Sequence, residues 1–178
     1  IDSEEIFPLY ERINEWDIPI VLHPDAFLSR RLNLPALKIL VPIPAPMENM
    51  MREAEMDVRK IREDSTLAAG RLLVLGEIER VTEFEKGMPG AEAEIKGQWV
   101  KDPFSDDRGV AVKVKNKELV VIGGCSHAGV INTVKHAQKV SGVPKVHAVL
   151  GGFHLTGPMM EPIIGPAIGE MKEFCPGY

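Results

Sequence analysis

The chain has 178 residues and a mass of 19.6 kDa, which predicts a single domain or part of one. A content of 44% hydrophobic and 26% charged residues is typical of a folded globular protein and argues against disorder. The 26 acidic and 21 basic residues give a formal charge of −5, and no basic patch stands out, so we expect no nucleic-acid partner.

The sequence contains no candidate membrane span and no secretory signal. The longest apolar stretches, residues 18–22 and 119–122, fall far below the ~20 residues that cross a bilayer. Cys125 and Cys175 form neither a CxxC pair nor a disulfide framework. We therefore expect a soluble protein in a reducing cytoplasm, with no membrane partner.

The first third of the chain predicts helices separated by one strand. Helical spacing of apolar residues indicates a helix over residues 6–16, and residues 18–22 read as a buried strand. His23-Pro24-Asp25 predicts a turn that caps a further helix, ending near residue 32.

Prolines and methionines mark the next part of the chain. Prolines at alternate positions over residues 40–46 predict an extended connector or an edge strand, resembling a flap. A methionine-rich face over residues 47–61 predicts a helix that packs in the core, with Glu55 and Arg59 as an i,i+4 pair.

The second half of the chain predicts alternating strands and helices. We expect a strand at residues 71–81, a long loop at 83–107, a β-hairpin at 110–122, and then a helix, a strand and a helix. The last three elements are expected over residues 130–140, 146–150 and 162–174. This order is typical of an α/β layered architecture in one domain.

Two predicted strands run into the same kind of segment, a Gly-Gly pair followed by a histidine. The segments are Gly-Gly-Cys-Ser-His at residues 123–127 and Gly-Gly-Phe-His at residues 151–154. Because ligands gather beyond the carboxyl ends of strands in α/β sheets, we expect His127 and His154 at one sheet edge. Two imidazoles there suit a divalent cation such as zinc, manganese or iron, although each histidine could instead only organise its own turn.

Five further residues are weaker candidates for contact with the metal or the substrate. His23 could join the same edge, but an ordinary strand-to-helix turn is favoured. Asp106 and Asp107 could orient a ligand histidine, bind the metal directly or form an exposed acidic turn. Cys125 could be a thiolate nucleophile, although a buried neutral thiol is favoured, and Ser126 lies between it and His127.

Taken together, these segments resemble the metallo-β-lactamase-fold superfamily. Asp106-Asp107, residues 123–133 and residues 151–155 carry the resemblance, and residues 21–27, 76–80 and 156–158 also fit. Within the superfamily, the chain is similar to the branch of 7,8-dihydropterin-6-methyl-4-(β-D-ribofuranosyl)aminobenzene 5'-phosphate synthase and related metal-dependent hydrolases.

This resemblance implies an αββα sandwich with a mono- or dinuclear metal site at one sheet edge. It implies that His127 is a metal ligand, zinc being the first choice, and that His154 ligates or supports the site. The His-x-His-x-Asp-His cluster and the late His-Cys-Thr-Gly element of the family do not occur in the 178 residues. We therefore expect residues 1–178 to be an internal segment, with the fold incomplete at both ends.

Two functions follow as hypotheses. The first is a metal-dependent hydrolase that acts on a small phosphorylated or pterin-like substrate through a metal-activated water, with residues 83–107 and the proline-rich segment shaping the pocket. The second is a non-catalytic remnant that binds a ligand or partner without turnover. An unpaired sheet edge would then favour a homo-oligomer or a complementing chain.

Overall fold

The computed structural model describes residues 18–34, 39–43, 48–115 and 117–174. The chain divides into two compact units, one of Ile1–Ile61 and Gly90–Asp106, the other of Arg62–Pro89 and Asp107–Tyr178. The expectation of a single domain stays a prediction. The helix expected at residues 6–16 lies outside the described residues.

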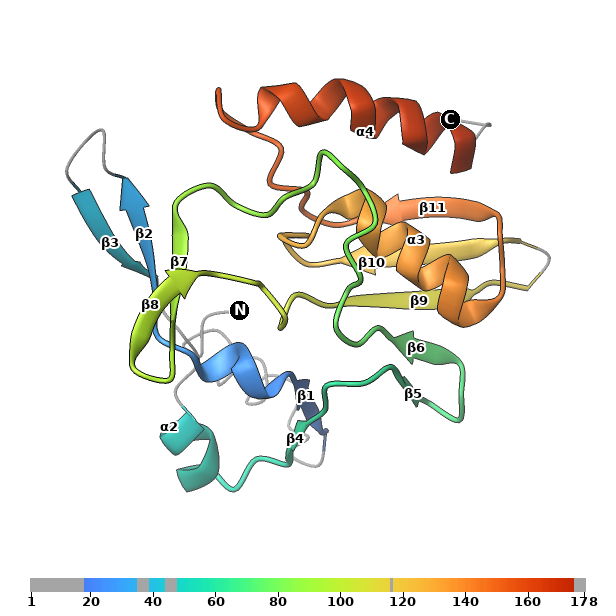
Figure 1. Cartoon of the computed structure of the whole chain (residues 1–178). Coiled ribbons are helices and arrows are strands. Elements are labelled where there is room, and N and C mark those ends of the chain that lie inside the picture. Colours follow the sequence, from blue (N-terminus) through green and yellow to red (C-terminus); the bar gives the residue numbers. More distant parts are fainter. Residues whose placement is uncertain (1–17, 35–38, 44–47, 116, 175–178) are drawn as a thin grey trace. The chain divides into compact units, whose positions relative to one another are not determined.

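The second unit is built on a five-stranded sheet with the order β11-β10-β9-β6-β5 (Figure 1). Its β10 and β11 are parallel, whereas the other neighbours are antiparallel. The strands are β5 (Ser65–Leu67), β6 (Leu72–Val74), β9 (Gly109–Lys113), β10 (Leu119–Gly123) and β11 (Val146–Leu150). The hairpin expected at residues 110–122 and the strand expected at 146–150 are confirmed.

Two helices complete the second unit. α3 (Val130–Ser141) connects the parallel strands β10 and β11 and packs on β9 and β10, and α4 (Glu161–Phe174) packs against α3 (Figure 1). Both helices were expected within one residue of where they begin and end. Val121, Ile131 and Val134 are fully buried, and each contributes about 1.5–3 kcal/mol by leaving water.

The first unit contains an antiparallel sheet with the order β3-β2-β7-β8 and a separate parallel pair of β1 and β4. Met51 is fully buried and packs with Met56, as expected of methionines in a core. The elements are β1 (Ile20–Leu22), the 3-10 helix η1 (Pro24–Phe27), β2 (Arg30–Leu34), β3 (Ile39–Ile43), α2 (Glu48–Glu53), β4 (Val58–Lys60), β7 (Ala91–Ile95) and β8 (Gln98–Lys101).

Two helix predictions in the first unit are wrong in extent. The helix expected from residue 25 to 32 is only the single turn η1, because Arg30–Leu34 pairs with β3 and β7 as strand β2. The helix expected over residues 47–61 is only α2, since Glu55 has a φ of 55° and the chain then becomes β4. Arg59 consequently bonds Asp57 rather than the predicted Glu55.

The long loop expected at residues 83–107 is also wrong. Ala91–Ile95 and Gln98–Lys101 form a hairpin, β7 and β8, closed by Lys96 and Gly97 at φ values of 52° and 77°. The alternating Ala-Glu-Ala-Glu-Ile sequence before a Lys-Gly turn was the overlooked signal for this hairpin. The strand expected at residues 71–81 ends at Val74, and its neighbour β5 was not predicted.

The proline-rich segment pairs more regularly than expected. β3 forms the edge of its sheet, and its Pro42 lies opposite Arg31 of β2. A proline is tolerated in an edge strand because its missing N–H can face away from the ladder. The sequence predicted either an extended connector or an edge strand here, and the edge strand is confirmed for residues 39–43.

Asp64 forms hydrogen bonds that join the start of the second unit to the segment after β6 and to α3. Its Oδ1 accepts hydrogen bonds from the backbone N–H of Gly76, at 2.7 Å, and from Nε2 of His136, at 2.9 Å. Burial alone would raise the pKa of the Asp64 carboxyl, but these hydrogen bonds hold that pKa below its ordinary value.

We expect Asp64 to make the stability of the protein depend on pH in the acid range. A carboxyl with a lowered pKa in the folded state contributes stability above its unfolded pKa of about 3.9, and this contribution is lost as the pH falls through the folded value. Urea unfolding from about pH 5 down to about pH 2 should therefore show a shallower acid decline for Asp64→Asn than for the control Glu63→Gln. Equal declines in both variants would contradict this role.

No helix among the described residues is long and apolar enough to cross a membrane. A pocket of about 520 Å³ opens between β11 and α4, at the edge of the five-stranded sheet. Apolar side chains line most of it, among them Val149, Phe153 and Ile168.

Candidate metal centre

The parallel pairing of β10 and β11 brings the two glycine–histidine segments to one end of the sheet. Ile122 lies opposite Leu150 in the ladder, so residues 124–129 and 151–154 leave the sheet side by side. The carboxyl ends of neighbouring parallel strands meet at the same sheet edge. The expected proximity of the two segments therefore follows directly from the β-α-β connection.

The glycine pairs allow the two segments to touch through their backbones. The N–H of Gly152 donates a hydrogen bond of 2.7 Å to the carbonyl oxygen of Gly124. Gly151 has a φ of 136°, and a Cβ there would overlap the carbonyl oxygen of Gly123. A side chain at residue 151 would thus force the segments apart, which explains the need for glycine at this strand end.

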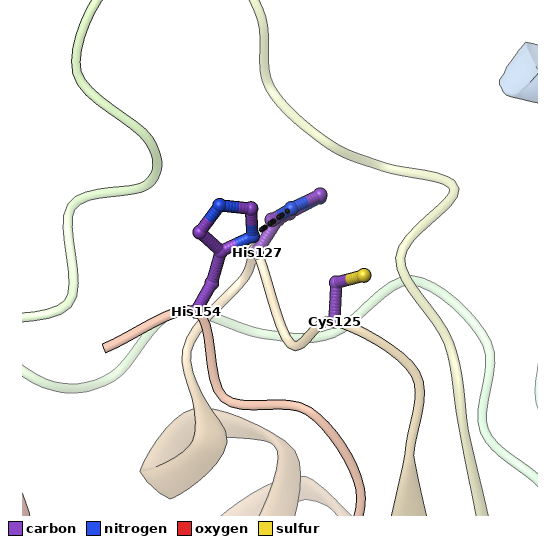
Figure 2. Close-up of side chains that lie close together, drawn as sticks. All are labelled: Cys125, His127 and His154. Carbon is purple, nitrogen blue, oxygen red and sulfur yellow. Dashed lines mark hydrogen bonds between the residues drawn. The ribbon is translucent and has the colours of Figure 1, made fainter. Parts of the chain in front are cut away.

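His127 and His154 face one another across this contact (Figure 2). Nε2 of His127 lies 2.9 Å from Nδ1 of His154, and the ring centroids are 4.8 Å apart. Two nitrogens bound to one tetrahedral zinc ion at about 2.0 to 2.1 Å would lie about 3.3 Å apart. The observed distance between the two nitrogens is therefore within a few tenths of an ångström of the distance that a shared ion would require.

His154 is held in a strained backbone conformation. Its φ of 49° lies in the left-handed region, which costs a residue other than glycine on the order of 1–3 kcal/mol. Strain of this kind is concentrated at functional sites, where the surrounding structure maintains it. The conformation directs the ring toward His127 (Figure 2).

Cys125 is the third potential metal ligand of the group. Its Sγ and one nitrogen of each ring all lie within 4.8 Å of one another, although Sγ is directed away from the rings (Figure 2). The expected buried thiol is wrong, because Cys125 is exposed. Two imidazoles and a thiol match the ligand types of zinc, so the chemistry of the donor set fits such an ion.

Ser126 and Asp107 support the turn that carries His127. Ser126 is only 6% exposed, has a φ of 55°, and accepts a hydrogen bond from the N–H of Gly129 through its carbonyl oxygen. Oδ2 of Asp107 accepts a 2.8 Å hydrogen bond from the N–H of Ala128. Both residues therefore act on the backbone on either side of His127.

His23 and Asp106 belong to the first unit. His23 is 1% exposed, and its Nδ1 accepts a hydrogen bond from the N–H of Asp25, which is the favoured turn interpretation. Oδ1 of Asp106 accepts a 2.6 Å hydrogen bond from Arg30. Burial raises the pKa of the Asp106 carboxyl, and the charge of Arg30 opposes this rise. His127 lies in the other unit.

Glu85 is a residue near the candidate site that the sequence did not reveal. It is 4% exposed, and its carboxylate accepts hydrogen bonds from the N–H groups of Ile131 and Asn132 at the start of α3. Burial raises the pKa of this carboxyl, although these hydrogen bonds oppose the rise. No local signal could have indicated this contact, because Glu85 lies 46 residues before Ile131.

Comparison with known proteins bears out the resemblance. No family model matches the sequence. The chain is 30% identical, over 97% of its length, to 7,8-dihydropterin-6-methyl-4-(β-D-ribofuranosyl)-aminobenzene-5'-phosphate synthase of Methanocaldococcus jannaschii. Its structure matches that of Tm1679, a metal-dependent hydrolase of the β-lactamase superfamily, with a TM-score of 0.72, 20% identity and coverage of 91% of the chain. The chain therefore has the fold of this metal-dependent hydrolase of the β-lactamase superfamily.

A second relative is the uncharacterized protein MJ0448 of the same organism, 31% identical over 78% of the chain. The chain covers 60% and 48% of the lengths of the two relatives and 58% of the Tm1679 chain. The α/β metallo-β-lactamase fold expected from the sequence is confirmed. The cytoplasmic location, the absence of a nucleic-acid partner and the association with a second chain stay predictions.

Proposed function

We propose that the protein is a metal-dependent enzyme that acts on a small organic substrate at a divalent ion held by His127 and His154. The 2.9 Å approach of their ring nitrogens is the observation that carries this proposal. The name of the M. jannaschii relative favours a substrate with a phosphate group or a pterin-like ring. The description of Tm1679 as a metal-dependent hydrolase favours hydrolysis.

The two rings can serve one ion only in a defined protonation state. Nε2 of His127 and Nδ1 of His154 face each other, so both must be free of a proton to bind a metal. The protons then lie on Nδ1 of His127 and Nε2 of His154, which leaves those atoms to donate hydrogen bonds outward. Metal binding should therefore replace the direct contact between the rings and should weaken as the imidazoles become protonated.

Cys125 would complete a set of three protein donors and leave one position for substrate or water, as in catalytic zinc sites. The thiol and imidazole donors favour zinc, with iron or manganese as alternatives. When bound, such an ion lowers the pKa of a bound water to about 7 and polarises a phosphoryl or carbonyl oxygen. The chain's own contribution is to hold the three donors at one end of the sheet.

Removal and return of metal tests the proposal. Purified protein treated with a chelator should lose hydrolysis of p-nitrophenyl phosphate or bis(p-nitrophenyl) phosphate, and zinc, manganese or iron(II) should restore it. His127→Ala should not be restored by any of the three ions. Its matched control is His147→Ala, which removes a histidine of β11 whose Nδ1 lies 4.0 Å from Glu118. Folded protein that neither retains metal nor turns over either ester would contradict the proposal and favour a non-catalytic binding module.

A further inference from the structure

The helix that follows His127 is capped by a distant side chain rather than by its own N-terminal residues. Gly129 precedes α3 and supplies no side-chain cap, so the first N–H groups of the helix need other acceptors. Oε1 of Glu85 accepts from the N–H of Ile131 at 2.9 Å, and Oε2 accepts from the N–H of Asn132 at 2.8 Å. A carboxylate at this end of the helix also interacts favourably with the helix dipole.

Asn132, in the first turn of α3, forms hydrogen bonds in the opposite direction, back to the segment that carries Glu85. Its Oδ1 accepts hydrogen bonds of 2.9 Å from the N–H groups of Val81 and Thr82, and its Nδ2 donates a 2.8 Å bond to the carbonyl oxygen of Ala128. Asn132 is fully buried. Residues 81–85 and the start of α3 are therefore joined in both directions by buried, hydrogen-bonded side chains, which is a rigid arrangement.

The same network reaches the backbone of the residue that follows His127. Ala128, the next residue, bonds Asp107 through its N–H and Asn132 through its carbonyl oxygen. The hydroxyl of Thr82 donates to Oε2 of Glu85 at 3.2 Å and thereby orients the carboxylate. Residues 81–85, more than 40 residues before His127, are thus linked through Asn132 to the residue that follows it.

Gly129 shows how closely Glu85 approaches this turn. A Cβ at Gly129 would overlap the carboxylate and side chain of Glu85, and Gly129 has a φ of 110°. The carboxylate therefore occupies the space that a side chain at residue 129 would fill.

We propose that Glu85 is a positioning residue for His127, because its buried carboxylate holds the start of α3 and the turn from which the ring reaches its metal. This inference rests on the proposed function for the role of His127, but the placement of the ring by Glu85 is independent of any bound ion. A cap with a purely structural role would stabilise α3 without affecting the ring.

The test compares Glu85→Gln with Glu79→Gln. The amide introduced by the first substitution has the size of the carboxylate but offers one acceptor oxygen for the two N–H groups of Ile131 and Asn132. Glu79 is a matched control because it comes from the same segment and bonds Lys139 near the other end of α3. Zinc affinity is measured by competition with a chromogenic chelator, at a temperature at which unfolding curves show every variant to be folded.

We expect Glu85→Gln to weaken zinc binding by about 10- to 100-fold, as is usual for residues that orient metal ligands, and Glu79→Gln to leave it within about twofold. In the metal-free protein, the ring NMR signals of His127 should shift or broaden in Glu85→Gln and stay unchanged in Glu79→Gln. If Glu85→Gln does not fold, Thr82→Ala replaces it, with an expected loss of about 2- to 10-fold because the hydroxyl makes two hydrogen bonds with Glu85.

Two results separate the failure of this inference from the failure of the proposed function. Wild-type zinc affinity and unchanged His127 ring signals in Glu85→Gln would overturn the positioning role while leaving the metal site intact. A wild-type protein that binds no zinc, manganese or iron would overturn the proposed function. The ring signals of the metal-free variants would then still decide whether Glu85 places His127.

Discussion

Replacing His127 or His154 by alanine should weaken zinc binding by at least about 100-fold. The nitrogens of the two rings lie 2.9 Å apart, so each ring supplies one of the few donors within reach of a shared ion. Loss of a residue that only orients a ligand already costs about 10- to 100-fold in metal affinity, and loss of a donor should cost at least as much. Chelator competition followed by metal analysis of the purified variants measures the effect.

The double variant distinguishes a shared ion from two separate sites. If both rings bind one ion, the double variant should lose less zinc-binding free energy than the two single variants lose together, because residues in contact are coupled. His147→Ala, which removes a histidine within β11 itself, should bind zinc as the wild type does. Additive losses, or a single variant with unchanged affinity, would contradict a shared site.

Gly151→Ala should lower the free energy of unfolding by about 2–5 kcal/mol and weaken metal binding as well. The new Cβ would overlap the carbonyl oxygen of Gly123, and alanine would be strained at a φ of 136°. The chain can relieve the overlap only by moving residues 151–154 away from residues 123–124, which separates the two histidines. Urea unfolding and chelator competition on the same preparation measure both effects.

Gly157→Ala is the control for this substitution. Gly157 lies in the same connection and has a φ of 82°, but no atom lies within 4 Å of the position of its Cβ. It therefore carries the conformational strain without the overlap, and its metal affinity should not change. Equal losses of stability and unchanged metal affinity in both variants would show that the close approach of the glycine pairs does not place His154.

The sequence predicted the second unit better than the first for a physical reason. The hairpin of β9 and β10, the helix α3 and the strand β11 have strong local periodicity and are bounded by glycine or proline, so short segments determine their structure. In the first unit, β2 is decided by pairing with β3 and β7 on both sides. Such contacts between distant segments override the weak local preference for helix.

The residues of the candidate site could likewise be predicted from the sequence only where local structure brings them together. His127 and His154 could be predicted to meet because both follow parallel strands that one helix connects, and the parallel ladder brings their ends together. The role of Glu85 could not be predicted, because it depends on where residues 81–85 cross the end of α3. The exposure of Cys125 depends likewise on how the turn at Ser126 is folded.

The most direct test of the shared metal site is a crystal structure of the zinc-loaded protein with anomalous data collected on both sides of the zinc edge. We expect a single anomalous peak about 2.0 to 2.2 Å from both Nε2 of His127 and Nδ1 of His154, with the two nitrogens more than about 3 Å apart. Rings still in direct contact, with zinc absent or bound to neither of them, would contradict the account.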